Sequence, residues 1–520
     1  MQINISNLTF AYDGTYDNIF EDVSFQLDTD WKLGFTGRNG RGKTTFLNLL
    51  LGKYEYTGKI STGVKFDYFP ATMPREGQSW ITRRVIDGVC RGFEEWELLR
   101  EMSLLDIPEE VLARPFGTLS NGEQTKILLA ALFLKENNFL LIDEPTNHLD
   151  AHGRRLVSRY LSGKKGFILV SHDRAFLDGC IDHVLSINRA NIEVQRGNFS
   201  SWLANKELRD SFELAENAKL KKEIKRLQTA ARQSSRFADK AETAKMGKGA
   251  AAARKKGHVT TGSKEYQAKK SLKMQQRRKN LERRQDSAIE EKSALLKNLD
   301  NADALKISQL PLHTGRFVGL RDVAISYGEN GANGGNSAKV VCRDVNFTIE
   351  RGDRIALCGK NGSGKSSILK LIIGGGEGGR GGESHENMTS TGEITKASGL
   401  KISYVSQDTS HLAGNLTDFA SENNIDESLF KSILHKLDFS RVQFEKDMQT
   451  FSGGQKKKTL LAKSLCEKAH LLIWDEPLNF VDILSRMQIE ELLVSHAPTI
   501  LFVEHDTVFC EKIATKRIQM

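Results

Sequence analysis

Two glycine-rich stretches in this 520-residue chain have the spacing of a loop that binds phosphate. They read GRNGRGKTT at 37–45 and GKNGSGKSS at 359–367, and each follows an apolar run that predicts a strand. Glycines let backbone N–H groups surround phosphate oxygens, and the start of the next helix adds a positive dipole. The residues expected to bind nucleotide phosphates are Gly37, Asn39, Gly40, Gly42, Lys43, Thr44 and Thr45 in the first copy, and Gly359, Asn361, Gly362, Gly364, Lys365, Ser366 and Ser367 in the second.

Paired acids follow a second apolar run in each copy. Asp143 and Asp475 end these runs, where a buried strand can deliver a carboxylate to Mg²⁺ beside the hydroxyl of Thr44 or Ser366. The next residue is Glu144 in the first copy and Glu476 in the second, placed to orient or deprotonate an attacking water.

The chain therefore repeats itself, and the repeat defines its organisation. Each copy alternates short apolar runs with helix-length amphipathic segments, the pattern of an α/β domain with a largely parallel sheet. We expect the copies over 1–205 and 315–520, with 206–314 between them. The six cysteines lack zinc-site spacing, and no apolar run reaches the about 20 residues of a membrane span, so we expect a reduced, cytoplasmic protein.

The segment between the copies carries the positive charge of the chain. Residues 219–284 contain 22 Lys and Arg against 5 Asp and Glu, a net charge of +17, whereas the whole chain has +9. Few helix breakers interrupt it, which predicts two long helices over about 206–243 and 264–300, joined by a Gly-, Ala- and Lys-containing tip at about 244–263.

The motifs together resemble the ATP-binding-cassette (ABC) ATPases. LSNGEQ at 119–124 and FSGGQ at 451–455 look like that family's signature sequence, and His172 and His505 fall at its switch-histidine position. The resemblance implies an α/β fold class with two tandem ABC-type P-loop ATPase domains joined by a long α-helical hairpin linker, without a transmembrane segment. It also implies ATP and Mg²⁺ as cofactors.

In that family two cassettes pack head to tail, so each ATP lies between the phosphate loop of one and the signature of the other. Carried over, site 1 joins the first phosphate loop to the second signature, and site 2 joins the second loop to the first signature. The signature residues involved would be Ser120 and Gly122 for site 2, and Ser452, Gly453 and Gly454 for site 1. The catalytic residues would be Glu144, Glu476, His172 and His505.

Further positions match the family or depart from it. Tyr12 and Tyr327 resemble the adenine-stacking position, although an ordinary tyrosine at a strand end is the alternative. Gln407 stands where the family places its Mg²⁺- and water-contacting glutamine, but the first copy offers Ala71. Asn121 replaces the first signature glycine. These departures predict two sites of unequal rate.

The fused cassettes, TNHLD at 146–150 and the charged linker resemble the ABC-F class of ribosome-associated ATPases, and stretches such as LRDSFELAENAKLKKEIKRL look like its Lsa/Vga-type antibiotic-resistance members. The class implies a monomer, with its cassettes paired within one chain, that binds the bacterial 70S ribosome, with rRNA and P-site tRNA as contacts and neither membrane nor DNA as partners. The linker would enter the exit-tRNA site towards the peptidyl-transferase centre and protect against lincosamide, pleuromutilin and streptogramin A type drugs. ATP hydrolysis would release the protein.

The charge of the linker supports a polyanionic partner, because +17 in 66 residues would otherwise repel itself. The side chains expected to bind RNA are Lys245, Lys248, Arg254, Lys255, Lys256 and Tyr266. A solvated helical spacer is the plain alternative. Three other functions stay open: a housekeeping ABC-F translation factor, a soluble ATPase subunit of a membrane exporter, and a DNA-repair cassette.

Overall fold

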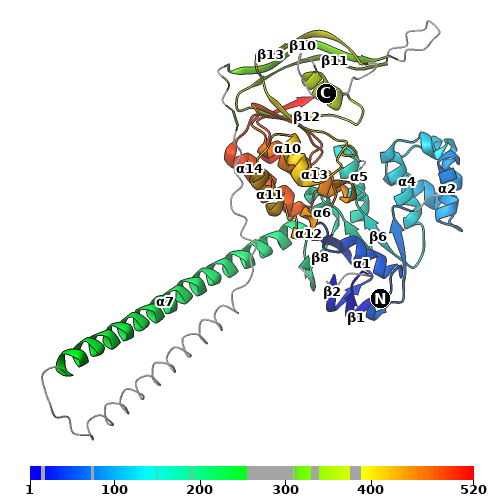
Figure 1. The fold of residues 1–520 in the computed structure, drawn as a ribbon. Coiled ribbons are helices and arrows are strands. Elements are labelled where there is room, and N and C mark those ends of the chain that lie inside the picture. The colour runs from blue at the N-terminus through cyan, green and yellow to red at the C-terminus, as the bar shows by residue number, and fades with distance from the viewer. Residues whose placement is uncertain are drawn as a thin grey trace. The chain divides into compact units, whose positions relative to one another are not determined.

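The computed structural model describes residues 1–12, 18–71, 75–147, 149–188, 191–253, 309–310, 312, 314–328, 339–374 and 388–520. Two compact units emerge. One contains Met1–Trp202 and Ala302–Met520, and therefore both copies of the repeat. The other, Leu203–Asn301, belongs to the linker (Figure 1).

The first copy, cassette 1, is built on a six-stranded sheet in the order β5-β6-β7-β3-β8-β9. All its pairings are parallel except β8 with β9. A separate antiparallel sheet has the order β2-β1-β4. The strands are β1 (Gln2–Phe10), β2 (Phe20–Asp28), β3 (Lys32–Thr36), β4 (Thr57–Ser61), β5 (Lys65–Phe69), β6 (Asn138–Asp143), β7 (Phe167–Val170), β8 (His183–Asn188) and β9 (Asn191–Arg196).

Helices surround these sheets and form a separate group between β5 and β6 (Figure 1). Those that alternate with the parallel strands are α1 (Lys43–Leu50), α5 (Ala151–Ser162) and α6 (Arg174–Cys180). The group between β5 and β6 contains α2 (Thr82–Val89), α3 (Glu95–Leu104) and α4 (Asn121–Phe133), with short 3₁₀ turns η1 (Arg75–Ser79), η2 (Glu109–Ala113) and η3 (Phe116–Thr118).

The second copy, cassette 2, repeats this plan. Its parallel sheet has the order β14-β15-β16-β12-β17, and its antiparallel sheet the order β11-β10-β13. The strands are β10 (Arg316–Tyr327), β11 (Lys339–Glu350), β12 (Arg354–Cys358), β13 (Met388–Lys396), β14 (Ile402–Val405), β15 (Leu471–Asp475), β16 (Ile500–Val503) and β17 (Lys516–Gln519). The helices are α9 (Lys365–Gly374), α10 (Leu416–Glu422), α11 (Glu427–Lys436), α12 (Arg441–Phe444), α13 (Gly453–Cys466), α14 (Ile483–His496) and α15 (Thr507–Ile513), with η4 at Met448–Thr450.

The central strands of both parallel sheets are buried on both faces. β7 (FILV) and β16 (ILFV) are buried along their whole length, which is why they read as continuous apolar runs rather than alternating ones. The expected α/β class with two tandem domains of the same plan is confirmed. No helix in the described part of the chain is long and apolar enough to cross a membrane.

The linker helix differs from the expectation. A single helix, α7, runs over Phe199–Ala253 and so continues ten residues past its expected end at 243. The alanines at 250–253 explain this, because alanine is the strongest helix former and outweighs the glycines at 247 and 249. The second expected helix, 264–300, lies outside the described residues. The boundaries 205/206 and 314/315 stay a prediction.

Candidate active sites

The parallel sheets gather the predicted residues of each site at one edge. In cassette 1 the strands β6, β7 and β3 are neighbours in the sheet. β6 ends at Asp143, β7 ends shortly before His172, and β3 ends where the phosphate loop begins. Cassette 2 does the same with β15, β16 and β12. Since the carboxyl ends of parallel strands share an edge, three motifs far apart in sequence meet there.

The two phosphate loops have the same backbone. Gly42 and Gly364 both have φ 94°, and a β-carbon at Gly42 would lie 2.6 Å from Ile19. Only glycine fits both conditions. The Lys43 amine donates to Gly37 O at 2.7 Å, and the Lys365 amine donates to Gly359 O at 2.9 Å. Both lysines thus lie across their own loop, close to where phosphate oxygens would bind.

The predicted magnesium ligands lie beside each other in both sites. Thr44 Oγ1 is 3.2 Å from Asp143 Oδ2, and Ser366 Oγ is 3.1 Å from Asp475 Oδ1. Burial raises the pKa of Asp475 to about 6 and also raises that of Asp143. Hydroxyl and carboxylate oxygens suit Mg²⁺, and a cation would offset the cost of burying these carboxylates. The residues therefore fit the ion.

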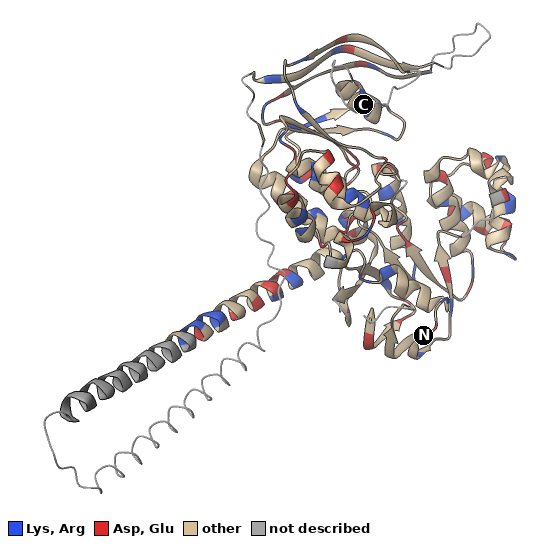
Figure 2. Ribbon diagram, viewed as in Figure 1, with Lys and Arg blue, Asp and Glu red and all other residues tan. Residues whose placement is uncertain are grey.

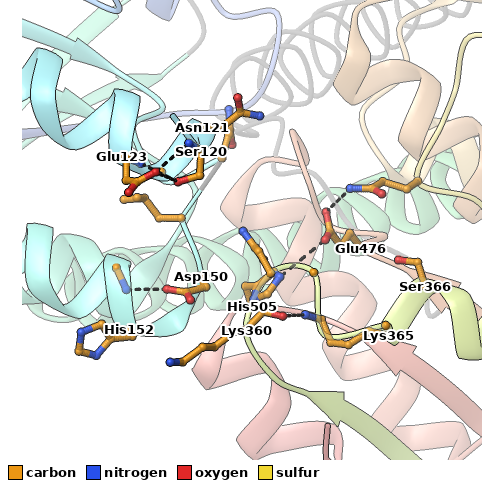
Figure 3. Close-up of a pocket in the computed structure, with 18 of the residues that line it drawn as sticks. Ser120, Asn121, Glu123, Asp150, His152, Lys360, Lys365, Ser366, Glu476 and His505 are labelled. Atoms are coloured by element: carbon orange, nitrogen blue, oxygen red, sulfur yellow. Dashed lines mark hydrogen bonds and ion pairs between the residues drawn. The ribbon is translucent and has the colours of Figure 1, made fainter. Parts of the chain in front are cut away.

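Glu476 is held by three side chains. Gln407 Nε2 donates to its Oε2 at 2.8 Å, and Asn479 Nδ2 donates to the same oxygen at 2.6 Å. His505 Nε2 lies 3.6 Å from Oε1 (Figure 3). Burial alone would raise the pKa of Glu476, but these contacts with His505 and Asn479 outweigh it and lower the pKa. Glu476 is therefore a charged, oriented acceptor for a proton.

Glu144 has a similar exposure, 17% against 16%, but different surroundings. Both of its carboxylate oxygens are buried and have no hydrogen-bond partner in the described part of the chain, although His172 Nε2 lies 3.2 Å from Oε1. Burial, and next the charge of Asp143, raise the pKa of Glu144 to about 8. Burial and Lys43 hold the pKa of His172 well below its usual range, so this histidine is neutral.

A cavity of about 920 Å³ joins the two cassettes at site 2. The signature residues Ser120, Asn121 and Gly122 line it from cassette 1, opposite Lys365 and Ser366 of cassette 2 (Figure 3). Asn361, Gly362, Gly364, Ser367, Gln407, Glu476 and His505 also line it. Ser120 caps α4, where it accepts from Glu123 N, so the helix start is directed at the cavity. The head-to-tail arrangement expected for site 2 is present.

Site 1 is tightly packed across the same interface. Asn39 Nδ2 donates to Phe480 O at 2.6 Å, and a β-carbon on Gly454 would lie 2.7 Å from Asn39 Nδ2. Arg38 and Arg41 of the first phosphate loop lie 3.1 and 3.5 Å from Asp438 of cassette 2. The phosphate loop of cassette 1 therefore faces the signature of cassette 2.

The remaining predicted residues are the two tyrosines expected beside the adenine base and the linker residues expected to bind RNA. The Tyr12 hydroxyl forms a hydrogen bond with Thr45 Oγ1 at 2.8 Å, and the Tyr327 hydroxyl forms one with Ser367 Oγ at 2.9 Å. Each ring therefore lies beside the helix that follows a phosphate loop. Their contact with a base stays a prediction. The backbone at Lys245 and Lys248 is in α7, whereas Arg254, Lys255, Lys256 and Tyr266 lie outside the described residues.

Sequence reasoning missed several residues of the two sites. Asn479 lies three residues after Glu476, a spacing that could have suggested its role. Asp438 and Phe480 could not have been found from sequence, because each contacts the opposite cassette. No motif or spacing predicts that Asp438 pairs with Arg38 or that Phe480 accepts a hydrogen bond from Asn39.

A family model described as "ABC transporter" matches residues 20–147 and 342–479, half of the chain. The chain belongs to the ABC family. Its expected activity as a P-loop ABC ATPase, the hydrolysis of ATP to ADP and phosphate, follows from this membership.

Three relatives can be aligned with this ABC protein over nearly its whole length. The ribosome protection protein VmlR of Bacillus subtilis is 26% identical over 98% of this chain and 85% of its own length. The energy-dependent translational throttle protein EttA of Haemophilus influenzae is 23% identical over 96% of this chain and 88% of its own length. The Arabidopsis thaliana protein named ABC transporter F family member 2 is 24% identical over the whole chain and 76% of its own length. The Arabidopsis relative is thus named for the F family of ABC proteins.

Solved structures agree on the fold. The archaeal ribosome recycling factor aABCE1, in its complex with a ribosomal stalk protein, matches 99% of this chain and 87% of its own with a TM-score of 0.59 at 16% identity.

Proposed function

We propose that this ABC-F ATPase binds the bacterial 70S ribosome in the cytoplasm while ATP holds its cassettes closed, and that it leaves after hydrolysis. The cavity of site 2, lined by a phosphate loop on one side and a signature helix on the other, carries the proposal. A γ-phosphate bound there would contact both cassettes, so ATP would favour the closed pair. The names of VmlR and EttA point to translation as the process.

The proposed chemistry uses the residues of each site in the same way. Lys365 and its loop bind the β- and γ-phosphates, and Ser120 and Gly122 contact the γ-phosphate from the other cassette. Glu476, oriented by Gln407, accepts a proton from the attacking water. Ser366 and Asp475 would hold Mg²⁺, which would supply positive charge to the phosphates. Site 1 uses Lys43, Thr44, Asp143, Glu144, His172, Ser452 and Gly454 correspondingly.

The linker is proposed to contact rRNA, and P-site tRNA, from the exit-tRNA site. In the described side chains of α7 the charges are unevenly placed: residues 207–216 carry four acids, and residues 219–226 carry five Lys and Arg against one Glu (Figure 2). The local net charge of the helix is thus negative over 207–216 and positive over 219–226. Such a segment would neutralise RNA phosphates with a steep dependence on salt.

Ribosome pelleting across a salt series tests this function. The Glu144→Gln, Glu476→Gln double variant should bind ATP without hydrolysing it and sediment with 70S particles, and the bound fraction should fall steeply as salt rises. The same variant with ADP is the control. Failure to sediment with ATP even at low ionic strength would refute ribosome binding.

Protection against lincosamide, pleuromutilin and streptogramin A type drugs is the finer proposal, and it follows the similarity to VmlR. The similarity to EttA favours a second candidate, a housekeeping translation factor. Drug susceptibility of cells with and without the gene separates the two. Deleting 246–258 should abolish protection while ATP binding persists, and retained protection would exclude this segment from the mechanism.

A further inference from the structure

Cassette 2 buries a lysine that the proposed chemistry does not use. Lys457, on α13, is 2% exposed and is among the largest fully buried side chains of the described chain. A lysine is almost never fully buried unless it is paired. Its neighbour Lys458 pairs with Asp482 at 2.6 Å, whereas Lys457 has no ion pair among the described residues. Other contacts of the Lys457 amine must therefore account for its burial.

The Lys457 amine contacts main-chain carbonyls at the ends of two neighbouring strands. Its Nζ donates to Ser406 O at 2.8 Å, directly after β14, and lies 3.5 Å from Asp475 O, at the end of β15. β14 and β15 are parallel, and their last pairing joins Val405 to Trp474. One amine thus holds the two positions at which these strands leave the sheet.

The next residue after each of these carbonyls belongs to the proposed hydrolysis machinery of site 2. Gln407 follows Ser406, and Glu476 follows Asp475. Gln407 Nε2 donates to Glu476 Oε2 at 2.8 Å. Each of these side chains starts one residue beyond a carbonyl that the Lys457 amine contacts. The amine therefore sets the separation of the two main chains between which this hydrogen bond forms.

The charges around Lys457 suggest a second, purely structural role. Burial lowers the pKa of Lys457, while the carboxylates of Glu504, Asp475 and Glu476 raise it in part. Glu504 is itself buried, at 7% exposure. A protonated lysine offsets part of the cost of burying such carboxylates. A buried counter-charge is therefore the alternative that an experiment has to separate from positioning.

Cassette 1 differs at both ends of this arrangement. In its signature helix, α4, the position that matches Lys457 is Thr125, which is uncharged. At the position of Gln407 cassette 1 has Ala71. The buried lysine thus occurs in the copy that has a glutamine for it to position.

We propose that Lys457 is a positioning residue for site 2, which holds the ends of β14 and β15 so that Gln407 orients Glu476. This deepens the proposed function and rests on its assignment of Glu144 to site 1 and Glu476 to site 2. The assignment is tested first and separately: each single Gln variant should retain turnover, and the double variant should lose it. Both tests measure ATP hydrolysis by the free protein, so neither depends on ribosome binding.

The test of Lys457 measures kcat and KM for ATP in the full chain, with one site silenced at a time. In the Glu144→Gln background, where site 2 turns over, Lys457→Met should lower kcat about fivefold and leave KM nearly unchanged, because Glu476 loses orientation while the phosphate loop is untouched. In the Glu476→Gln background the same substitution should change neither constant, although the start of α13 belongs to site 1. Lys463→Met, on the same helix, is the matched control and should change neither constant at either site.

Two further variants separate positioning from a counter-charge. Lys457→Gln keeps a donor without a charge, so it should retain part of the kcat that Lys457→Met loses. Its loss of kcat should again be confined to site 2, which keeps the test decisive if the Met variant does not fold. Adding Lys457→Met to Gln407→Ala should lower kcat little further, because both substitutions act on the orientation of Glu476.

Three results would overturn the proposal. Equal losses at both sites would mean that Lys457 supports α13 as a whole. Fully additive effects of Lys457→Met and Gln407→Ala would mean that the lysine does not act through the glutamine. Lower stability with an unchanged kcat at site 2 would reduce Lys457 to a counter-charge for Glu504.

Discussion

Glu144 and Glu476 have nearly the same backbone, with φ 51° and 46°, and the same place after a buried strand. Their surroundings separate them. Glu476 has two amide side-chain donors, whereas Glu144 has none in the described part of the chain. A histidine lies near each carboxylate, at 3.6 Å for Glu476 and 3.2 Å for Glu144. A base must be both charged and oriented to accept a proton, so site 2 has the better arranged group. This gives a physical reason for the unequal rates expected from the sequence.

Gln407 offers a direct test of that difference. Replacing Gln407 by Ala gives site 2 the residue that site 1 has at the aligned position, Ala71. In the Glu144→Gln background we expect kcat to fall about tenfold with a smaller change in KM, because a donor to the catalytic carboxylate is lost while the phosphate loop is untouched.

Steady-state ATP hydrolysis measures the effect, and Thr409→Ala, in the same loop, is the matched control. Ala71→Gln in the Glu476→Gln background is the reciprocal change, expected to raise kcat at site 1. An unchanged kcat after Gln407→Ala would show that the hydrogen bond to Glu476 does not matter for turnover.

At the scale of single residues, the sequence predicted which side chains form each site but not which side chains contact one another across the two cassettes. The lysines, acids and histidines of both sites follow from spacing, because the strand and the loop that present them are local. The Asn39–Phe480 contact depends on how two domains pack, and it joins positions 441 residues apart. Local pattern contains no information about such a pair.

The ends of single helices were predictable where the sequence contains a capping motif. Ser120 with Glu123, and Ser452 with Gln455, form capping boxes that start α4 and α13. The signature motifs thus also contain the signal that begins their helices. The end of α7 was harder to place, because a short run of alanines and glycines leaves the balance between helix and turn nearly even.

Within cassette 1 a buried acid connects α3 to the end of α5. Glu101 is 1% exposed, accepts from Tyr160 OH at 2.6 Å and pairs with Lys164. Burial by itself would raise the pKa of Glu101, but the hydrogen bonds from Lys164 and Tyr160 outweigh it and hold the pKa below its ordinary value. Its contribution to stability is therefore present above about pH 4.3 and is lost as the pH falls through the lower pKa of the folded state.

We expect Glu101→Gln to destabilise the protein by about 1–3 kcal/mol at pH 7, because a charged acceptor between buried donors is replaced by a neutral one. The difference from the wild type should shrink as the pH falls from about 4.3 through the lowered pKa of Glu101, where Glu101 itself becomes protonated. Denaturant unfolding at both pH values measures it. Glu110→Gln, at an exposed position, should change little at either pH. A difference in unfolding free energy between Glu101→Gln and the wild type that does not depend on pH would contradict this account.

At the scale of the whole ATPase, the cassettes are joined away from both ATP sites by a buried ion pair. Arg174 at the start of α6 makes a bidentate contact with Glu490 on α14, and Lys512 lies 3.2 Å from the same carboxylate. Glu490 is fully buried. The corresponding positions in the other cassette are Thr507 and Ser158, which cannot form an ion pair. The interface is therefore asymmetric even though its two halves share a fold.

This asymmetry predicts a strongly coupled pair of substitutions. Glu490→Leu alone should destabilise the protein by about 3–5 kcal/mol, since it leaves the buried Arg174 without its partner. Arg174→Met alone should cost less, because Lys512 still pairs with Glu490. Together they should recover most of that loss, because apolar side chains of similar volume can replace a buried ion pair at little cost. Thermal unfolding of the four proteins in this cycle gives the coupling energy. Lys431→Met, which removes the exposed pair with Glu427, should change stability little, because solvent screens this pair. Additive effects of Arg174→Met and Glu490→Leu would mean that the contact does not hold the cassettes together, and pairing would then depend on the two nucleotide sites.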